Sequence, residues 1–454
     1  MSKNRSFSVP IALLAAGALF LEILDGTILS VAVPAIAQDF GVNPVDISIA
    51  LIAYLAAAAA GIPAAGWLGD RFGVRIVLLS ALAIFTAGSL LCALAPGLVM
   101  LTVARIIQGL GGALLVPVGR LAVIRTTKPE DLLDAIAFLT WPALIAPVVA
   151  PVLGGVISDN FGWRWIFLLN IPLGIVALIV GFIILPRGTD IPSRPFDLPG
   201  FIGVALVTVA LTIAAELIAR GTPTALVMAA VLAICAVVIA TLVVRWLRAP
   251  GRLFDLSVMT IATFRVGNIS GSVYRLVITA APFMFTLLFQ VEFGWSATTA
   301  GGIVVALFAG NIAIKPFTSA IIRQWSFRPV LLFANASGAL ILAAFFFVDA
   351  ETPRILILLL LFISGALRSL GFSAYNTLQF ADISGAQTSN ANVLSATLQQ
   401  LGMSLGIAVA AICMSIASSP QWSFPLAALL FVFPLAGAYL LPQSGGARAL
   451  HPTS

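Results

Sequence analysis

The sequence predicts an all-α integral membrane protein, and two observations carry this prediction. Of the 454 residues, 61% are hydrophobic and 9% are charged, whereas soluble domains carry about 25% charged residues. The mean hydropathy is +1.13, and apolar runs follow one another along the whole chain. A chain this poor in charge must keep most of its side chains in contact with lipid or with one another.

Each element of this fold is a run long enough to cross a bilayer. A helix needs about 20 apolar residues to span ~30 Å of hydrocarbon, and fourteen such runs lie between polar or Gly/Pro breaks. They cover residues 10–36, 47–67, 76–95, 98–120, 135–157, 165–185, 200–219, 223–246, 265–289, 297–321, 329–349, 355–376, 393–417 and 421–441. We therefore expect fourteen transmembrane helices arranged as six, two and six.

This arrangement predicts the domain organisation and the orientation. Residues 1–186 are expected to form an N-terminal six-helix bundle, 187–252 two linker helices, 253–442 a C-terminal six-helix bundle, and 443–454 a tail. With the N-terminus inside, sixteen of the 23 Lys and Arg residues fall in cytoplasmic segments and three fall outside. Because short cytoplasmic loops are enriched in Lys and Arg, we expect both termini in the cytoplasm.

The composition argues against several classes of protein. The cations stand singly at span ends, so the net charge of +6 indicates no nucleic-acid partner. None of the three lysines lies in a phosphate-binding loop. The three cysteines lie singly in apolar runs and the one histidine, His451, lies in the tail, so no metal site and no catalytic cluster is expected. Any transport by this chain would need an ion gradient or an ATPase on another chain.

Three charges lie deep in the first and fourth spans. Glu22 and Asp25 share a face of the first helix because they are spaced i, i+3, and Arg105 lies at a depth that allows contact with Asp25. A charge in hydrocarbon costs at least ~2.5–3.5 kcal/mol unless a partner or a cavity offsets it. We interpret the three residues as a proton-coupling site, with Asp25 as the main titrating acid, or as a structural ion pair between two helices.

Arg275 is the deepest cation of the C-terminal half. It lies near the middle of the ninth span, too deep for its side chain to reach the interface easily. Binding an anionic group and pairing inside the protein are both open to it. Lys315 and Arg368 lie nearer the predicted cytoplasmic side, where snorkelling explains them almost as well.

Several motifs, in order along the chain, carry a resemblance to a known family. Segment 66–75, GWLGDRFGVR, resembles the loop signature of the major facilitator superfamily. Segments 24–28 (LDGTI), 105–112 (RIIQGLGG) and 163–167 (WRWIF) resemble motifs of its fourteen-span drug/proton antiporter branch. Segment 376–406 is similar to the multidrug resistance members of the MdtD type. The resemblance covers nearly the whole chain and implies a major facilitator fold.

The fifth span carries a further motif of the same family. Pro147, Pro151, Gly154 and Gly155 resemble its antiporter motif, although alanines precede the two prolines where the family usually has glycines. Proline interrupts the backbone hydrogen-bond ladder, so this helix should bend. The resemblance implies that this helix-bending motif takes part in coupling.

The resemblance also implies roles for a loop and a cavity. Gly66, Asp70, Arg71, Gly73 and Arg75 would form a gating loop in which Asp70 and Arg75 make charged contacts that close the cytoplasmic face. The structural alternative is that Arg71 and Arg75 only anchor the topology. The substrate cavity would be lined by Arg275, Trp141, Gln108, Tyr274, Tyr375 and Asn376.

Together these features predict a proton-coupled secondary transporter of the bacterial inner membrane that exports small amphipathic compounds by alternating access. Its partners would be a small-molecule substrate, protons and the lipid bilayer, and it would work as a monomer without a cofactor. One alternative is a proton-coupled exporter of organic anions or carboxylates, because four intramembrane cations outnumber the two central acids. A different class is a non-transporting membrane scaffold subunit, and an embedded enzyme would lack the residues for a catalytic site.

Overall fold

The computed structural model describes residues 8–126, 132–186, 196–249, 252–254, 256–383, 387–417, 419–443 and 445–446, without the side chains of 132–144 and 388–390. Within these residues every regular element is a helix. Most of the predicted tail 443–454 lies outside the described residues. So do six of the cations used to predict the orientation, which are Lys3, Arg5, Lys128, Arg187, Arg194 and Arg448.

The chain divides into two compact units, Met1–Phe201 and Ile202–Ser454. The helices of the first unit are α1 (Val9–Phe40), η1 (Pro44–Ile47), α2 (Ser48–Arg71), α3 (Val74–Ala93), α4 (Leu98–Thr126), α5 (Leu132–Asn160), α6 (Arg164–Leu168) and α7 (Asn170–Ile184). Helix α8 (Leu198–Arg220) begins at the end of this unit and continues into the next. The separate linker at 187–252 stays a prediction.

The second unit holds the remaining helices. They are α9 (Pro223–Leu247), η3 (Leu256–Thr260), α10 (Ala262–Leu287) with a π turn η4 (Leu288–Glu292), α11 (Ala297–Trp325), α12 (Phe327–Ala344), η5 (Phe345–Phe347), α13 (Arg354–Leu378), α14 (Thr388–Ile416), α15 (Pro420–Leu429) and α16 (Val432–Leu440).

The predicted number of spans is confirmed. In the part of the chain that the structure describes, thirteen helical segments are long and apolar enough to cross a membrane. The fourteenth is α5, a helix of 29 residues whose described side chains form an apolar stretch over Ile145–Asn160. The orientation of the termini stays a prediction.

Two of the spans are interrupted, and a proline explains each interruption. The sixth span consists of α6 and α7, and α6 ends at Leu168, four residues before Pro172. The fourteenth consists of α15 and α16, which are separated at Leu430, four residues before Pro434. Proline has no N–H for the carbonyl four residues earlier, and its ring clashes with that carbonyl. Each span is therefore two shorter helical segments.

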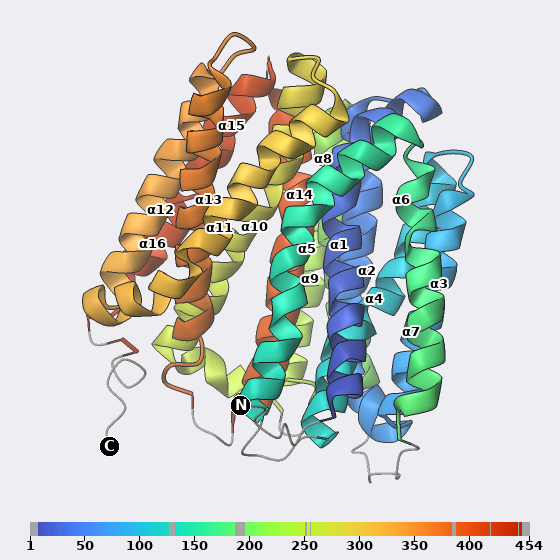
Figure 1. Cartoon of the computed structure of the whole chain (residues 1–454). Coiled ribbons are helices and arrows are strands. Elements are labelled where there is room, and N and C mark those ends of the chain that lie inside the picture. Colours follow the sequence, from blue (N-terminus) through green and yellow to red (C-terminus); the bar gives the residue numbers. More distant parts are fainter. Residues whose placement is uncertain are drawn as a thin grey trace, which may run out of the picture. The chain divides into compact units, whose positions relative to one another are not determined.

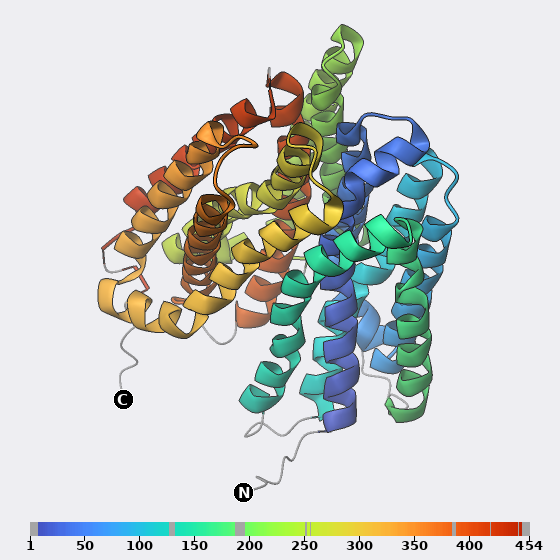
Figure 2. The ribbon, with the colours of Figure 1, turned by 45° about the horizontal axis from the view of Figure 1, so that its top comes forward.

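Helix α5 bends and packs closely on α1. Figures 1 and 2 show the bend over the later turns of α5, as its prolines predict. A Cβ at Gly154 would lie 2.7 Å from Cγ1 of Ile28 on α1, so the two helices approach as closely as a glycine allows. Ala146 and Ala150, which stand where the family usually has glycine, are fully buried. Their methyl groups are thus accommodated in the packed unit.

In the second unit, α11 and α13 cross at two glycines. A Cβ on Gly310 of α11 would collide with the carbonyl oxygen of Phe362, and a Cβ on Gly365 of α13 would collide with that of Leu307. Only glycine permits two backbones to approach this closely. We call this contact the glycine crossing.

Among the candidate spans, helix α9 carries the surface that is best suited to lipid. Only 11% of the apolar window of α9 is buried inside the protein, against 67% for α10. Helix α8 is held by α14, where the hydroxyls of Thr212 and Ser404 lie 3.5 Å apart. Large exposed apolar side chains such as Val231 and Ile234 cover α9, which is expected of a lipid-facing helix.

Candidate functional site

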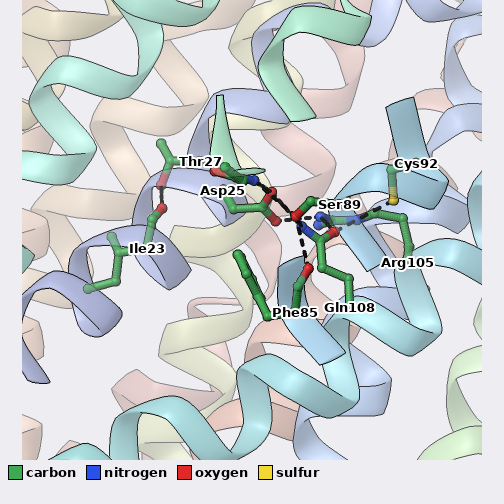
Figure 3. A network of polar contacts seen from close by, with 9 residues as sticks. Ile23, Asp25, Thr27, Phe85, Ser89, Cys92, Arg105 and Gln108 are labelled. Carbon is green, nitrogen blue, oxygen red and sulfur yellow. Dashed lines mark hydrogen bonds and ion pairs between the residues drawn. The ribbon is translucent and has the colours of Figure 1, made fainter. Parts of the chain in front are cut away.

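A first cluster of buried polar side chains lies inside the first unit, and we call it the acid–arginine cluster. Its members are Asp25 on α1, Ser89 on α3, Arg105 and Gln108 on α4, and Asn170 on α7. Four of them are labelled in Figure 3, which shows them pointing toward one another. All five have relative exposures of 0–1%. Four helices, α1, α3, α4 and α7, therefore meet through polar groups.

The hydrogen bonds of this cluster converge on the Asp25 carboxylate. Nη1 of Arg105 donates to Oδ2 of Asp25, which is the contact that the sequence predicted. Oδ1 of Asp25 accepts from Nε2 of Gln108 at 2.9 Å and from Nδ2 of Asn170 at 2.7 Å. Both carboxylate oxygens are satisfied and the charge is balanced, which is what offsets the cost of burying an ion pair.

The remaining contacts hold Gln108 and Arg105 in place. Nε2 of Gln108 also donates to Oγ of Ser89 at 2.8 Å, and its Oε1 accepts from Nη1 of Arg105 at 2.6 Å. The guanidinium carbon of Arg105 lies 4.0 Å from the ring centroid of Tyr54, close enough for a cation–π contact. Gln108 was predicted to line the substrate cavity, and the structure places it wholly within this cluster.

Sequence reasoning missed two members of this cluster, Ser89 and Asn170. Asn170 follows the WRWIF motif closely and Ser89 is one of few polar residues in its span, so both carried a weak signal. A polar side chain in an apolar span is costly unless it is paired. That rule finds the residue, but it does not identify the partner on another helix.

Glu22 lies one turn before Asp25 on α1, and its surroundings are different. Its side chain is half-buried, and it makes no hydrogen bond or ion pair with the described residues. The same face of α1 is open at Gly26, where a Cβ would meet no atom within 4 Å. With two acids and one arginine at this depth, Glu22 is the acid left without a counter-ion.

A second polar cluster lies in the second unit, and we call it the cation cluster. It consists of Arg275 on α10, Lys315 on α11, and Phe372, Ser373 and Asn376 on α13. Nη2 of Arg275 donates to Oδ1 of Asn376 at 2.7 Å, and Nζ of Lys315 donates to Oγ of Ser373 at 3.1 Å. Both cations lie against the Phe372 ring, at 5.5 Å and 5.9 Å from its centroid.

The donors of the cation cluster are only partly satisfied. Nε and Nη1 of Arg275 are buried and have no hydrogen-bond partner in the described residues, although the side chain is only 1% exposed. Helices α10, α11 and α13 contain no Asp or Glu. Arg275 is thus buried without a counter-ion in the part of the chain that the structure describes.

Arg368 on α13 has a structural explanation. Its Nη2 donates to the carbonyl oxygen of Ile278 on α10. That carbonyl lies four residues before Pro282, which has no N–H to give it. Arg368 therefore satisfies a backbone acceptor that a proline leaves open inside the membrane.

Two of the predicted cavity residues, Tyr274 and Tyr375, lie in the interior of the second unit. The Tyr274 hydroxyl donates to the carbonyl oxygen of Arg368 at 2.9 Å. The Tyr375 hydroxyl accepts from Nδ2 of Asn335 at 3.0 Å and donates to the carbonyl oxygen of Pro434 at 3.3 Å. Both rings are at most 1% exposed. The side chain of Trp141, also predicted for the cavity, lies outside the described residues.

The predicted gating loop makes its contacts within the first unit. Asp70 pairs with Nη2 of Arg125 at the end of α4. Nη1 and Nη2 of Arg75 donate to the carbonyl oxygens of Leu185 and Phe182 at 2.5 Å and 2.6 Å, which caps the C-terminal end of α7. Arg71 is exposed, and open space surrounds the position of a Cβ at Gly66.

The turn at Gly73 has a counterpart in the second unit. Gly73 has φ 80° and ψ 147°, and Ser326, between α11 and α12, has φ 61° and ψ 170°. Glycine adopts this region freely, whereas any other residue is strained there. Ser326 is the one non-glycine with positive φ in the described residues. The two halves therefore repeat a turn whose glycine is present in only one of them.

The antiporter motif contacts α1 beside the acid–arginine cluster. Gly154 packs on Ile28, which lies one turn after Asp25. Pro151 and Gly155 are buried, and Pro147 is half-buried. The bent helix α5 thus packs on the same helix, α1, that carries the acid of the ion pair.

Membrane-length helices that carry charged groups in their interior are the architecture of membrane transporters. The comparisons with known proteins identify the family. The model of the Major Facilitator Superfamily matches residues 15–407, so this chain belongs to that superfamily. It is a multi-pass membrane transporter and not an enzyme.

Curated relatives agree with this assignment. The MdtD protein of Salmonella paratyphi A, named for multidrug resistance, is 34% identical over 391 residues, covering 86% of this chain and 83% of the relative. The MdtD protein of Serratia proteamaculans is 35% identical over 396 residues, covering 87% and 82%. The resemblance to MdtD-type proteins that the sequence motifs indicated is confirmed.

Solved structures confirm the fold. A D-xylose–proton symporter is similar over 97% of this chain and 99% of its own, with a TM-score of 0.67 and 13% identity. The POT family transporter PepTSo is similar over 98% and 99%, with a TM-score of 0.69 and 14% identity.

Proposed function

We propose that this chain exports small amphipathic molecules in exchange for protons, and that Glu22 is the acid that exchanges the proton. One observation carries the proposal. Asp25 is paired with Arg105, whereas Glu22, one turn away, is half-buried and has no partner in the described residues. An unpaired acid inside a membrane is costly, and it is retained where it serves transport.

Asp25 receives a different role in this proposal from the one that its motif suggested. Each hydrogen bond to its carboxylate comes from a donor on Arg105, Gln108 or Asn170. A proton on Asp25 would remove the negative charge that balances the buried Arg105. We therefore assign Asp25 and Arg105 a structural role. The pair holds α1 against α4 and stays ionised one turn away from Glu22.

For an amphipathic cation, the exchange would follow from competition between the substrate and a proton at the Glu22 carboxylate. When the site opens outward, Glu22 takes a proton, its charge disappears, and a bound amphipathic cation is released. When the site opens inward, the proton leaves and a new substrate molecule binds near the carboxylate. Each cycle then moves substrate out and a proton in, and both alternating states use the same residue.

We assign the conformational change between the two states to α5 and to the gating loop, because of their contacts with α1 and α4. The bend of α5 packs on α1 through Gly154, so rocking of α5 would reach the helix that carries Glu22. The Asp70–Arg125 pair joins α2 to α4 and would hold the gating loop in one state. We place both termini in the cytoplasm and the monomeric protein in the bacterial inner membrane, with a proton gradient and no cofactor.

The substrate class has two candidates. The MdtD relatives are named for multidrug resistance, which favours amphipathic drug-like compounds. The cation cluster, which has no acid in its three helices, favours organic anions as a second candidate.

Proton movement in liposomes tests the proposal. The purified protein is reconstituted with an internal pH indicator, and a panel of cationic, neutral and anionic amphipathic compounds is added. At least one compound should move protons with the wild-type protein. Glu22→Gln should abolish that movement and retain passive exchange of the same compound, and Glu292→Gln, at an exposed acid, is the matched control.

Two results would contradict the proposal. Full proton movement with Glu22→Gln would assign coupling to another group. No movement of any compound by the wild-type protein, in either exchange or gradient-driven assays, would favour the scaffold alternative.

A further inference from the structure

The cation cluster contains donors for which the protein supplies no acceptor. Arg275 uses Nη2 on Asn376 and leaves Nε and Nη1 without a partner in the described residues. Buried donors are almost always satisfied in native structures, and a buried guanidinium without a counter-ion is more costly than a neutral donor. The missing group must accept hydrogen bonds and carry negative charge.

The second cation lies beside the first. Asn376, which binds Arg275, and Ser373, which binds Lys315, are spaced i, i+3 and so are neighbours on one face of α13. The two partners are therefore separated by about one helical turn, ~5 Å. Lys315, Ser373 and Asn376 are half-buried, so this side of the cluster can be reached from outside the packed interior.

The other intramembrane cation of the second unit provides a contrast. Arg368 binds the carbonyl oxygen of Ile278 that Pro282 leaves open, so its position is explained by the fold. Arg275 and Lys315 have no such backbone acceptor among the described residues. The packed fold therefore gives Arg368 a backbone acceptor, although its Nη1 has no partner in the described residues, and it gives none to Arg275 or Lys315.

We propose that Arg275 and Lys315 bind the carboxylate of an organic anion that the protein transports, with the Phe372 ring against the apolar part of that anion. Arginine and lysine together match a carboxylate by charge-assisted hydrogen bonds. A substrate that carries both a carboxylate and an apolar body fits the two cations and the ring. The inference rests on the proposed transport function and selects the organic anion of the two substrate candidates, which would bind in the second unit and not at Glu22.

Paired ligands test the site. Benzoate and octanoate are compared with their neutral amides, benzamide and octanamide, as ligands of the purified full-length protein in nanodiscs of neutral lipid. The carboxylates should bind and the amides should bind at least ~10-fold more weakly, because a charge-assisted hydrogen bond is replaced by a neutral one. Lys315→Gln and Arg275→Gln should each lower carboxylate affinity by ~10- to 100-fold.

Control variants keep the test independent of folding. Arg323→Gln removes a cation from the same helix, α11, outside the cluster and should leave carboxylate affinity unchanged. If Arg275→Gln does not yield monodisperse protein, the carboxylate affinity of Lys315→Gln, at a half-buried position, tests the site instead. Equal affinity of amides and carboxylates, or unchanged carboxylate affinity in Lys315→Gln, would overturn the proposal.

A lipid headgroup is the other source of an anion, and a second arm separates it from a substrate. Nanodiscs that contain phosphatidylglycerol should reduce carboxylate binding only slightly if the site receives a transported anion. Complete loss of carboxylate binding in these nanodiscs would overturn the substrate assignment and show a lipid site.

The proton-flux assay distinguishes this proposal from the proposed function. Carboxylate binding without proton movement refutes proton coupling alone, and proton movement without carboxylate binding refutes this site alone.

Discussion

The two units bury their charges in opposite ways. In the first unit the Asp25 carboxylate pairs with Arg105 and accepts from Gln108 and Asn170, so no net charge remains inside the cluster, although Nε of Arg105 has no hydrogen-bond partner in the described residues. In the second unit Arg275 is equally buried, yet it has no counter-ion in the described residues, and two of its donors have no partner there.

Burial alone therefore does not determine how a charged side chain affects stability, because the presence of a counter-ion matters as well. A buried ion pair holds helices together, and removing one of its partners is strongly destabilising because the other charge is left buried without a counter-ion. A buried cation without a counter-ion adds nothing to the stability of the empty protein, and it is expected where a ligand supplies the negative charge. The same residue type, arginine, therefore predicts opposite effects on stability in the two units.

The largest expected effect is the loss of the paired arginine. Arg105→Gln should destabilise the protein by ~3–5 kcal/mol, because it leaves the Asp25 carboxylate buried without a counter-ion. The measurement is thermal or denaturant unfolding of the purified protein, followed by tryptophan fluorescence. The double variant Asp25→Asn, Arg105→Gln should recover most of this loss. A double variant no more stable than the single one would show that charge balance is not what holds the cluster.

The two turns give the next effect, with opposite signs. Ser326→Gly should stabilise the protein by ~1–3 kcal/mol, because it removes a strained backbone conformation that only glycine adopts freely. Gly73→Ser should destabilise it by a similar amount. Unfolding of the two variants measures both changes. If both substitutions change the stability in the same direction, the turns do not share one conformation.

The unpaired arginine should behave unlike the paired one. Arg275→Gln should leave the free energy of unfolding unchanged or raise it by ~1–2 kcal/mol, since it removes a buried charge that lacks a counter-ion. The same unfolding assay, run without added anions, compares it directly with Arg105→Gln. A loss as large as that of Arg105→Gln would mean that Arg275 has a structural partner, and the contrast between the units would fail.

The smallest effect on stability concerns the gating loop. Asp70 and Arg125 have side-chain exposures of 46% and 30%, and ion pairs this exposed contribute ~0–1 kcal/mol. Asp70→Asn should therefore unfold almost like the wild type but slow the maximal transport rate, with little change in half-saturating substrate concentration. Asp39→Asn breaks a similarly exposed pair with Arg164 and serves as the control. Unchanged maximal rate with much weaker binding would contradict a role in closure.

The positions of the spans could be predicted from the sequence because lipid requires a long apolar run whatever the helix packs against. Pro172 and Pro434 are visible in the sequence as well, but a proline in a membrane helix can also produce a bend without a break. Which outcome occurs depends on the packing of neighbouring helices. The sequence therefore predicted fourteen spans but not that two of them consist of two segments each.

The contact between Asp25 and Arg105 could be predicted from depth, because both charges lie at similar levels in their helices. Asn170 and Ser89 could not be placed, because a helix must be rotated correctly before its polar side chain is known to face inward. The acceptor of Arg368 requires two facts at once, a proline on α10 and the pairing of α10 with α13. Only the second of these is absent from the sequence.

The glycine crossing between α11 and α13 has a mechanical consequence for the cation cluster. Gly310 lies five residues before Lys315 on α11, which is a lever arm of ~7–8 Å along the helix axis. If the crossing angle between α11 and α13 changes by ~10° about this contact, the backbone at Lys315 moves by about 1 Å relative to α13. A hydrogen bond weakens when it is lengthened by such a distance. A small change in crossing angle would therefore lower the affinity for an anion that binds Arg275 and Lys315 together. Substituents at Gly310 or Gly365 would change the crossing angle, and affinity for the anion could thus be altered from two positions that never touch it.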